Sequence, residues 1–356
     1  MNEQQQQYVR ELERYTNAHG ASGGEGEVAQ LLAQDLNAWG SFSQDKLGSV
    51  AYSRGNEQGD NKGAPHILVT AHMDEVGFRV QSVTANGFLK FVPVGGWWGH
   101  TLLAQQVQVK TRRAERVLGV IGCKPVHFLP ASQRGHVMDI SEMFIDVGAS
   151  SRAEVQALGI SLGDYITPAT SFTPMAQPGR YVAKAFDNRV GCACLVEVAR
   201  SLPEGLSGAR LTLGATVQEE VGTRGVAPLA TVLQPDFAIV LEGTPADDTP
   251  GFALDTSQGL VGHGVQIRMH DPSAIMSPVM VDAAIEAAEA EGIPYQLAVR
   301  TSGGTDAGRL TQTNAGVPCL VLGVPARYVH THNSIIDLAD YEAMARLAVA
   351  LAQKLA

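Results

Sequence analysis

The chain has 356 residues and a formal net charge of −10, with 45% hydrophobic and 17% charged residues, a globular composition that can build a sizeable core. No basic cluster exceeds Arg112-Arg113, no apolar run reaches the ~18 residues that span a bilayer, and the N-terminus is polar, so nucleic-acid binding, a membrane span and a secretory signal are not expected. Four cysteines without a CxxC pair are too few for a disulfide framework, which predicts a reducing, cytoplasmic location.

The first part of the chain predicts helices followed by strands. Residues 2–39 predict two helices, because apolar side chains recur at helical spacing on either side of a glycine-containing break at 21–24. Residues 45–52 are typical of a turn that enters a strand. The polar, glycine-rich segment 54–65 predicts a loop, and the apolar residues 66–70 predict a short buried strand that leads directly to a histidine.

Residues 78–177 have a different, mostly β-like pattern. Apolar and polar residues alternate, and an asparagine–glycine pair at 86–87 is typical of a hairpin turn. One helix, with a capping box at its start, is predicted between Ser151 and Gly159. We interpret this stretch as an inserted β-rich domain. The predicted domains are thus a discontinuous catalytic domain of residues 1–77 and 178–356, and an inserted domain of residues 78–177.

Strands and helices alternate again after residue 181. Short buried apolar runs predict strands, and longer amphipathic segments predict helices. This alternation is typical of α/β proteins with a largely parallel sheet. The predicted fold class is therefore α/β, with a mixed, mostly parallel sheet flanked by helices. The predicted strands are 211–217, 237–241 and 318–323, and the predicted helices are 190–202, 279–291 and 341–355.

Imidazole and carboxylate side chains occur at the ends of several of these strands and at one helix start. In an open α/β sheet, ligands bind in the crevice outside the carboxyl ends of the strands, so we expect these groups to converge there. Nitrogen and oxygen ligands without a thiolate suit zinc, cobalt or manganese. There are more such groups than one tetrahedral ion needs, which favours a two-metal site with a bridging carboxylate. The residues are His72, Asp74, Asp187, Glu219, Glu220, Glu242 and His330.

Two adjacent carboxylates, Glu219 and Glu220, follow the strand 211–217. Successive strand residues point to opposite faces, so we expect one of them to ligate a metal and the other to act as acid or base. Asp187 at a helix start is the natural bridging ligand, and Asp74 is placed to fix the tautomer of a ligating His72. Each residue alone also has a structural explanation, such as a helix cap for Asp187, and it is their joint occurrence that favours a site.

Five segments, in this order along the chain, resemble the glutamyl/deblocking aminopeptidase family. This family comprises di-metal exopeptidases, some of whose members carry endoglucanase labels, and they assemble as tetrahedral (TET) dodecamers. The resemblance implies a zinc-exopeptidase-like catalytic domain, with the β-rich insertion as a dimerisation domain. The segments are residues 71–77, 185–189, 218–222, 302–307 and 327–330.

The resemblance also implies a role for each matching residue. His72 and Glu220 would be terminal ligands of two ions bridged by Asp187, with Glu242 beside His72 and His330 beside Glu220. The family often has aspartate where this chain has Glu242. The other implied features are Glu219 as general base, Asp74 orienting His72, substrate contacts from Thr305 and Asp306, a cis peptide bond between Asp187 and Asn188, and at most a supporting role for His332.

The sequence therefore predicts an aminopeptidase that removes the N-terminal residue of peptides, with a water between two divalent ions (zinc or cobalt, with manganese possible) giving its proton to Glu219. Further copies of the chain are the expected partners, with no nucleic acid or membrane. A deacylase of N-acyl amino acids would use the same chemistry. An endoglucanase-type glycoside hydrolase needs two acids on opposite sides of the bond, ~5 or ~6.5–9.5 Å apart, and the adjacent Glu219 and Glu220 do not fit this arrangement. Its chemistry would also leave His72 and His330 without a function. A non-catalytic assembly protein is the third alternative.

Overall fold

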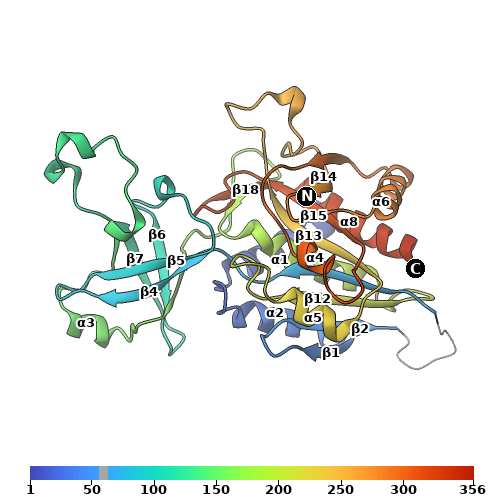
Figure 1. Cartoon of the computed structure of the whole chain (residues 1–356), viewed down its shortest axis with the longest axis horizontal. Coiled ribbons are helices and arrows are strands. Elements are labelled where there is room, and N and C mark those ends of the chain that lie inside the picture. Colours follow the sequence, from blue (N-terminus) through green and yellow to red (C-terminus); the bar gives the residue numbers. More distant parts are fainter. Residues whose placement is uncertain (56–62) are drawn as a thin grey trace.

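The computed structural model describes residues 1–55 and 63–356. It has two lobes, a larger body of helices around a sheet and a smaller β-barrel beside it (Figure 1). Both ends of the chain belong to the body. The loop predicted for residues 54–65 falls mostly on residues 56–62, which lie outside the described part of the chain.

The body is built around a mixed sheet, which in the described residues has nine strands in the order β1-β2-β12-β3-β13-β17-β14-β15, with β16 paired to β14. The four central strands, β12, β3, β13 and β17, are parallel to one another. The α/β fold class is thus confirmed. The strands are β1 (Ser41–Gln44), β2 (Val50–Arg54), β3 (His66–His72), β12 (Arg210–Thr216), β13 (Phe237–Pro245), β14 (Val265–Asp271), β15 (Ala274–Ile275), β16 (Tyr295–Val299) and β17 (Cys319–Ala326).

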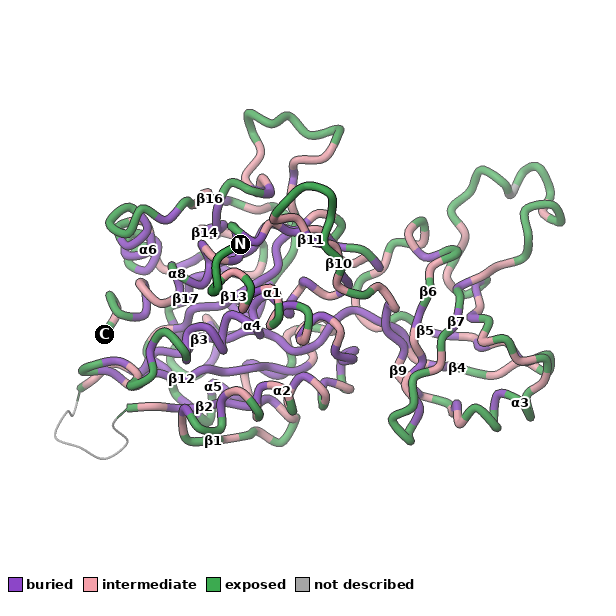
Figure 2. The backbone as a smooth tube through the Cα atoms, turned by 180° about the vertical axis from the view of Figure 1, so that it is seen from behind, coloured by how far each residue is buried: buried purple, intermediate pink, exposed green. Residues whose placement is uncertain are grey.

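Helices cover the sheet and bury its apolar side chains. Helix α4 packs against β3 and β13, while α1 and α8 pack against α4. The central strands β3, β12, β13 and β17 are buried, as the purple segments of Figure 2 show, whereas the edge strand β1 is mostly exposed. None of the helices in residues 1–55 and 63–356 combines the length and hydropathy that crossing a bilayer requires. The helices are α1 (Glu3–Asn17), α2 (Gly26–Leu36), α4 (Phe186–Ser201), α5 (Val226–Leu233), α6 (Pro278–Glu291), α7 (Ala307–Leu310) and α8 (Leu338–Leu355).

The smaller lobe is a closed barrel of antiparallel strands with its own apolar core. Ser151 caps its α-helix by accepting a hydrogen bond from the backbone N–H of Glu154, and Gly159 follows with a φ of 79°. The predicted capping box forms only in this half, because the carboxylate of Glu154 accepts the N–H of Ser150 rather than that of Ser151. The barrel strands are β4 (Gly77–Val83), β5 (Leu89–Val94), β8 (Phe144–Asp146), β7 (Arg116–Gly122), β6 (Gln106–Lys110) and β9 (Tyr165–Pro168), and the helix is α3 (Arg152–Ala157). The division into an inserted domain of residues 78–177 and a discontinuous catalytic domain stays a prediction.

Short elements complete the chain. A small sheet joins β10 and β11, which follow the barrel in the sequence, to β18, which follows β17, and it pairs residues 180–183 with residues 334–337. The bounds are β10 (Thr173–Pro174), β11 (Arg180–Ala183) and β18 (Ser334–Asp337), with 3-10 helices η1 (Gly99–Thr101), η2 (Val126–Phe128), η3 (Ala131–Gln133), η4 (Ile140–Glu142) and η5 (Leu254–Thr256).

The parallel pairing brings the carboxyl ends of four strands to one edge of the sheet. His72 at the end of β3 lies opposite Thr216 at the end of β12, and Glu242 in β13 lies opposite Gly323 in β17. The predicted strand that was expected to stop before Glu242 continues to Pro245, so this carboxylate projects from within a strand. The loops that follow β12 and β17 start at this same edge.

Candidate active site

His72 lies against two carboxylates at the sheet edge. Its Nε2 is 3.1 Å from Oδ1 of Asp187 and 3.5 Å from Oε2 of Glu242. One ligand atom from each of the three residues lies within 4.8 Å of the others, which is close enough for all three to hold one cation. His72 and Glu242 are buried, and Asp187 is half-buried.

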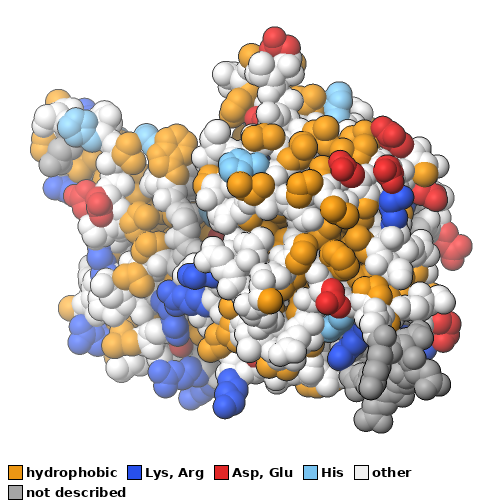
Figure 3. All heavy atoms as spheres, turned by 45° about the vertical axis from the view of Figure 1, so that its right-hand side comes forward, with side chains coloured by type: hydrophobic (Ala, Val, Ile, Leu, Met, Phe, Trp, Pro, Cys, Tyr) orange, Lys and Arg blue, Asp and Glu red, His pale blue; other side chains and the backbone are white. Residues whose placement is uncertain are grey.

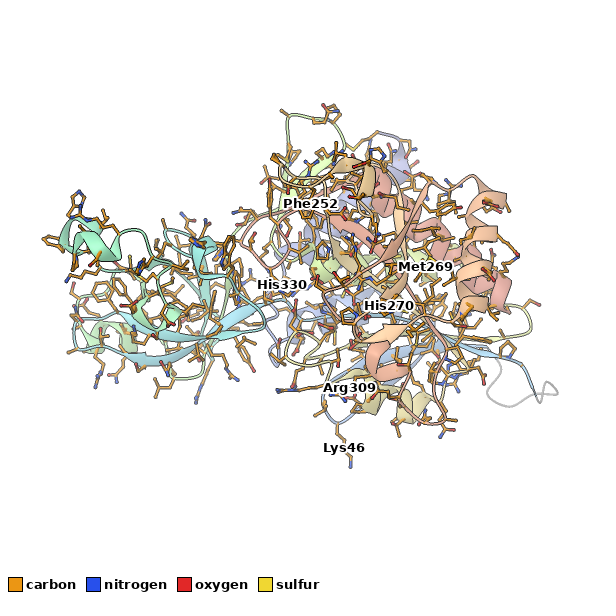
Figure 4. The ribbon with its side chains drawn as sticks, turned by 45° about the horizontal axis from the view of Figure 1, so that its top comes forward. Lys46, Phe252, Met269, His270, Arg309 and His330 are labelled. Atoms are coloured by element: carbon orange, nitrogen blue, oxygen red, sulfur yellow. The ribbon has the colours of Figure 1, made fainter. Side chains whose placement is uncertain are left out.

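His330 forms a second group on the other oxygen of Asp187. Its Nε2 lies 3.1 Å from Oε2 of Glu220 and 3.5 Å from Oδ2 of Asp187, and ligand atoms of these three residues also lie within 4.8 Å of one another. Figure 4 shows His330 where the barrel meets the body. The structure therefore brings together all five residues for which metal ligation was predicted, in two groups that share Asp187.

The backbone around Asp187 departs from a helix. The peptide bond between Asp187 and Asn188 is cis, and both residues have non-helical φ and ψ although they lie within the bounds of α4. The side-chain amide of Asn188 donates to the carbonyl of Leu241 at 2.7 Å and ties this turn to β13. A Cβ on Gly243 would lie 2.8 Å from Cα of Asp187, so β13 can approach the turn this closely only with glycine at that position.

Asp74 holds both His72 and the pair of glutamates. Its backbone carbonyl lies 3.0 Å from Nδ1 of His72, nearer than its carboxylate at 3.5 Å, so the carbonyl rather than the predicted carboxylate makes the closer contact. The carboxylate accepts the backbone N–H groups of Glu219 at 2.9 Å and Glu220 at 3.1 Å, and the hydroxyl of Ser22 at 2.6 Å. Asp74 thus fixes the turn from which Glu219 and Glu220 project.

The two groups attract positive charge strongly. Burial opposes protonation of His72, but Glu242 and Asp187 outweigh it and hold the pKa of this imidazole well above its ordinary value. Burial is likewise outweighed at His330, where Asp187 and Glu220 raise the pKa to about 11. Burial itself raises the pKa of Glu242 to about 7 and also raises the pKa of Glu220. The raised pKa values of both imidazoles thus reflect a strongly negative environment, which favours a cation.

Divalent cations fit this donor set. All five side chains offer nitrogen or oxygen ligands, which suits zinc, cobalt or manganese. Because the carbonyl of Asp74 receives Nδ1–H of His72, the lone pair of Nε2 is free to face a cation. Among the described residues, Oε1 of Glu220 is buried without a hydrogen-bond partner, and this oxygen belongs to a residue of the His330 group.

A cavity of about 650 Å³ opens beside the two groups. Glu219 lines it, and burial together with Glu242 and Asp306 holds the pKa of Glu219 well above its ordinary value. Thr305 also lines it, whereas Asp306 is 1% exposed and accepts a hydrogen bond from the hydroxyl of Thr216 at 2.6 Å. Of the two predicted substrate contacts, only Thr305 lies in the wall of the cavity.

Two arginines in the cavity wall were not predicted from the sequence. Arg268 lies on β14 and Arg300 follows β16, and neither strand was predicted. They belong to no recognisable motif, so the pattern of residues carried no signal for them.

His332, for which at most a supporting role was predicted, is buried. Its ring packs against that of Trp97, from the barrel side, at a centroid distance of 5.2 Å.

Comparison with known proteins places this site in a family. The model of the M42 glutamyl aminopeptidases matches residues 53–347. The chain belongs to the M42 glutamyl aminopeptidase family. A glutamyl aminopeptidase from Lactococcus lactis is 34% identical over 92% of this chain and 90% of its own length. The crystal structure of a TET aminopeptidase from a marine sediment archaeon (Thaumarchaeota) matches with a TM-score of 0.91 and 35% identity, over 98% of this chain and 96% of that one.

A second solved M42 relative bears on assembly. The TET1 peptidase of Pyrococcus horikoshii, which can assemble into a tetrahedron or a large octahedral shell, matches with a TM-score of 0.84 and 28% identity, over 97% of this chain and 99% of that one. Family membership makes the chain an aminopeptidase, a hydrolase that acts on peptides. The predicted family is thus confirmed, and the glycoside hydrolase and the non-catalytic protein are set aside.

Proposed function

We propose that this M42 peptidase is a di-metal aminopeptidase in which Glu219 is the general base. The observation that carries the proposal is the pair of ligand groups that share Asp187 at the wall of one cavity, with Glu219 lining the same cavity. One ion would be held by His72 and Glu242, the other by Glu220 and His330, and Asp187 would bridge them. Zinc, cobalt or manganese would fit these ligands, and when bound they would lower the pKa of a water and polarise the scissile carbonyl.

Glu219 would move the proton that hydrolysis requires. A carboxylate with a pKa raised toward neutrality can both accept a proton from the attacking water and return it. As the new C–O bond forms at the scissile carbonyl, Glu219 takes a proton from the water. As the C–N bond breaks, it passes that proton to the leaving amine. Asp74 supports this exchange, because its carboxylate holds the backbone of Glu219.

The cavity also suggests which N-terminal residue is removed. Arg268 is 4% exposed, its Nη2 donates to the hydroxyl of Thr244 at 2.7 Å, and its Nη1 pairs with Asp271 at 3.3 Å. Arg300 pairs with Asp247 at 2.7 Å. In the described residues, Nε of each arginine is buried without a partner. A substrate carboxylate could form charge-assisted hydrogen bonds with such guanidinium groups. We therefore propose that acidic N-terminal residues are preferred, with Thr305 as a further substrate contact.

Assembly with further copies of the chain is part of the proposal. The barrel exposes large hydrophobic side chains, including Trp98 (65% exposed), Leu118 (54%) and Phe128 (70%). Hydrophobic side chains are also spread over the visible faces of both lobes in Figure 3. Contiguous exposed apolar surface often marks a protein interface. A dimer formed through the barrel, and a tetrahedral dodecamer built from such dimers, would cover this surface.

The proposal is tested with metal-stripped protein that is reloaded with zinc, cobalt or manganese. We expect hydrolysis of aminoacyl-p-nitroanilides to return on reloading, with glutamyl substrates cleaved faster than leucyl or lysyl ones. Glu219→Gln should lower kcat by about 10²–10⁴-fold, the usual contribution of a general base, and should keep the metal content of the parent. Loss of metal from this variant would mean that Glu219 is a ligand. Hydrolysis of N-acyl amino acids alone would instead identify a deacylase.

A further inference from the structure

The turn that carries the glutamates is held by carboxylates at three consecutive backbone N–H groups. Asp74 accepts those of Glu219 and Glu220. The third, that of Gln218, donates to Oε1 of Glu25 at 3.1 Å. Glu25 lies at the start of α2, far from this turn in the sequence, and its side chain is 6% exposed. A buried carboxylate from a different part of the fold therefore completes the set.

Gln218 has a backbone conformation that needs such support. Its φ is +58°, in the left-handed region that residues other than glycine seldom adopt. A residue in that region costs of order 1–3 kcal/mol and keeps its conformation only where the surrounding structure imposes it. The hydrogen bond to Glu25 fixes the N–H of this residue. Because Glu219 follows directly, the direction of the Gln218 backbone decides where the side chain of Glu219 points.

Glu25 is itself held firmly in place. Oε1 also accepts the backbone N–H of Gly23 at 2.7 Å, so one oxygen joins the turn before α2 to the turn after β12. The hydroxyl of Tyr165, from the barrel, donates to the carbonyl of Gly23. The ring of Tyr165 packs so closely on Gly24 that a Cβ there would lie 3.1 Å from it. The turn that presents Glu25 thus contacts both the barrel, through Tyr165, and the strand end, through Gln218.

We propose that Glu25 is a positioning residue for catalysis, which acts by holding Gln218 in its left-handed conformation so that Glu219 faces the cavity. This inference rests on the proposed role of Glu219. The side chain of Glu25 accepts hydrogen bonds from Gln218 and Gly23, and Glu25 is not among the described residues that line the substrate cavity. It acts through one backbone hydrogen bond, and the property that matters is the acceptor oxygen.

The test compares Glu25→Ala, Glu25→Gln and Glu27→Ala in the metal-loaded full-length chain. Loss of the acceptor in Glu25→Ala should lower kcat by about tenfold to a hundredfold, because a misplacement of ~1 Å has that effect. KM should change by less than about threefold, since substrate binding is not touched. The amide oxygen in Glu25→Gln can accept both hydrogen bonds and should restore most of kcat.

Glu27 provides the matched control on the same helix. It accepts the N–H of His19 at 2.9 Å and pairs with Lys110 at 2.7 Å, so Glu27→Ala also removes partly buried contacts between α2 and its surroundings, away from Gln218. Its kcat per folded chain should equal that of the parent. Adding Gln218→Gly to Glu25→Ala should recover part of the lost kcat, because glycine adopts positive φ without cost.

Amide hydrogen exchange tests the inference independently of turnover. The backbone N–H of Gln218 should exchange faster in Glu25→Ala than in the parent or in Glu27→Ala. Unchanged exchange, an unchanged kcat in Glu25→Ala, or a Glu25→Gln variant as slow as Glu25→Ala would each overturn the inference. A parent that cleaves no aminoacyl substrate would refute the proposed function instead, and the exchange measurement would still decide the role of Glu25.

Discussion

Replacing Glu75 by glutamine should cost the protein about 3–5 kcal/mol of unfolding free energy at neutral pH, the range measured when one partner of a buried ion pair is removed. The Glu75 carboxylate is buried and accepts hydrogen bonds from Nζ of Lys184 at 2.6 and 2.8 Å and from Nη2 of Arg189 at 3.0 Å. The N–H of Gly20 adds a fourth contact at 3.2 Å. Glutamine keeps the shape but leaves two buried cations without their negative partner.

The same substitution should make stability depend on pH in a defined direction. Burial lowers the pKa of Lys184 to about 8, and Glu75 is the group that opposes this shift. Without Glu75, the folded-state pKa of Lys184 falls further, while the unfolded value stays near its ordinary 10.5. Between those two values the unfolded state binds more protons, so stability rises with pH. The variant therefore begins to gain stability at a lower pH than the parent. The difference in unfolding free energy between parent and variant narrows as the pH rises to about 8.

Urea unfolding of parent and variant, followed by tryptophan fluorescence at about pH 6 and about pH 9, measures both effects. The deficit should be larger at the lower pH and should persist in part at the higher one, because Arg189 stays charged. Glu204→Gln is the control, since Glu204 forms an exposed pair with Arg54 and should contribute little. A deficit below about 1 kcal/mol, or one that grows with pH, would refute the account of this cluster.

Three further predictions concern the active site. Arg268→Met should lower the ratio of kcat/KM for glutamyl to that for leucyl p-nitroanilides by about tenfold to a hundredfold, the contribution of a charge-assisted hydrogen bond. Arg346→Met, which lies outside the cavity lining, should leave this ratio unchanged. An unchanged ratio in Arg268→Met would mean that Arg268 does not select the substrate. His330→Ala should reduce the bound metal from two ions to one in elemental analysis, and retention of both would show that it is no ligand. Gly243→Ala should lower metal content and activity, because the added Cβ would lie 2.8 Å from Cα of Asp187. Gly26→Ala, where the added Cβ would meet nothing within 4 Å, should change neither. Equal metal content in both variants would show that β13 does not need glycine at position 243 to approach Asp187.

The central part of the fold was predictable because its signals are local. The apolar runs that became β3, β12 and β17 are buried on both faces, and a strand of this kind is recognisable from its own residues. Strands β14 and β16 were missed, because their mixed polar and apolar residues fit a strand only through pairing, of β14 with β17 and of β16 with β14. Arg268 lies on β14 and Arg300 directly follows β16, so these two arginines were missed together with the strands.

The convergence of the candidate ligand residues could be predicted from the sequence, but not the way in which these residues are held. Histidines and acids at strand ends converge because parallel strands share an edge, a rule that applies before any coordinates are known. The backbone carbonyl of Asp74 next to His72, the extension of β13 past Glu242 and the contact from Glu25 depend on distances between segments far apart in the chain. No pattern in the sequence encodes such distances.

The candidate ligands are spread along the chain from His72 to His330, and the last of them follows β17, the final described strand of the main sheet. A ribosome must therefore release the chain to beyond His330 before the proposed hydrolytic centre can assemble. In the proposed mechanism, a shorter nascent copy would not trim its own N-terminus or those of its neighbours. The order of segments along the gene would thus delay the onset of peptidase activity during synthesis.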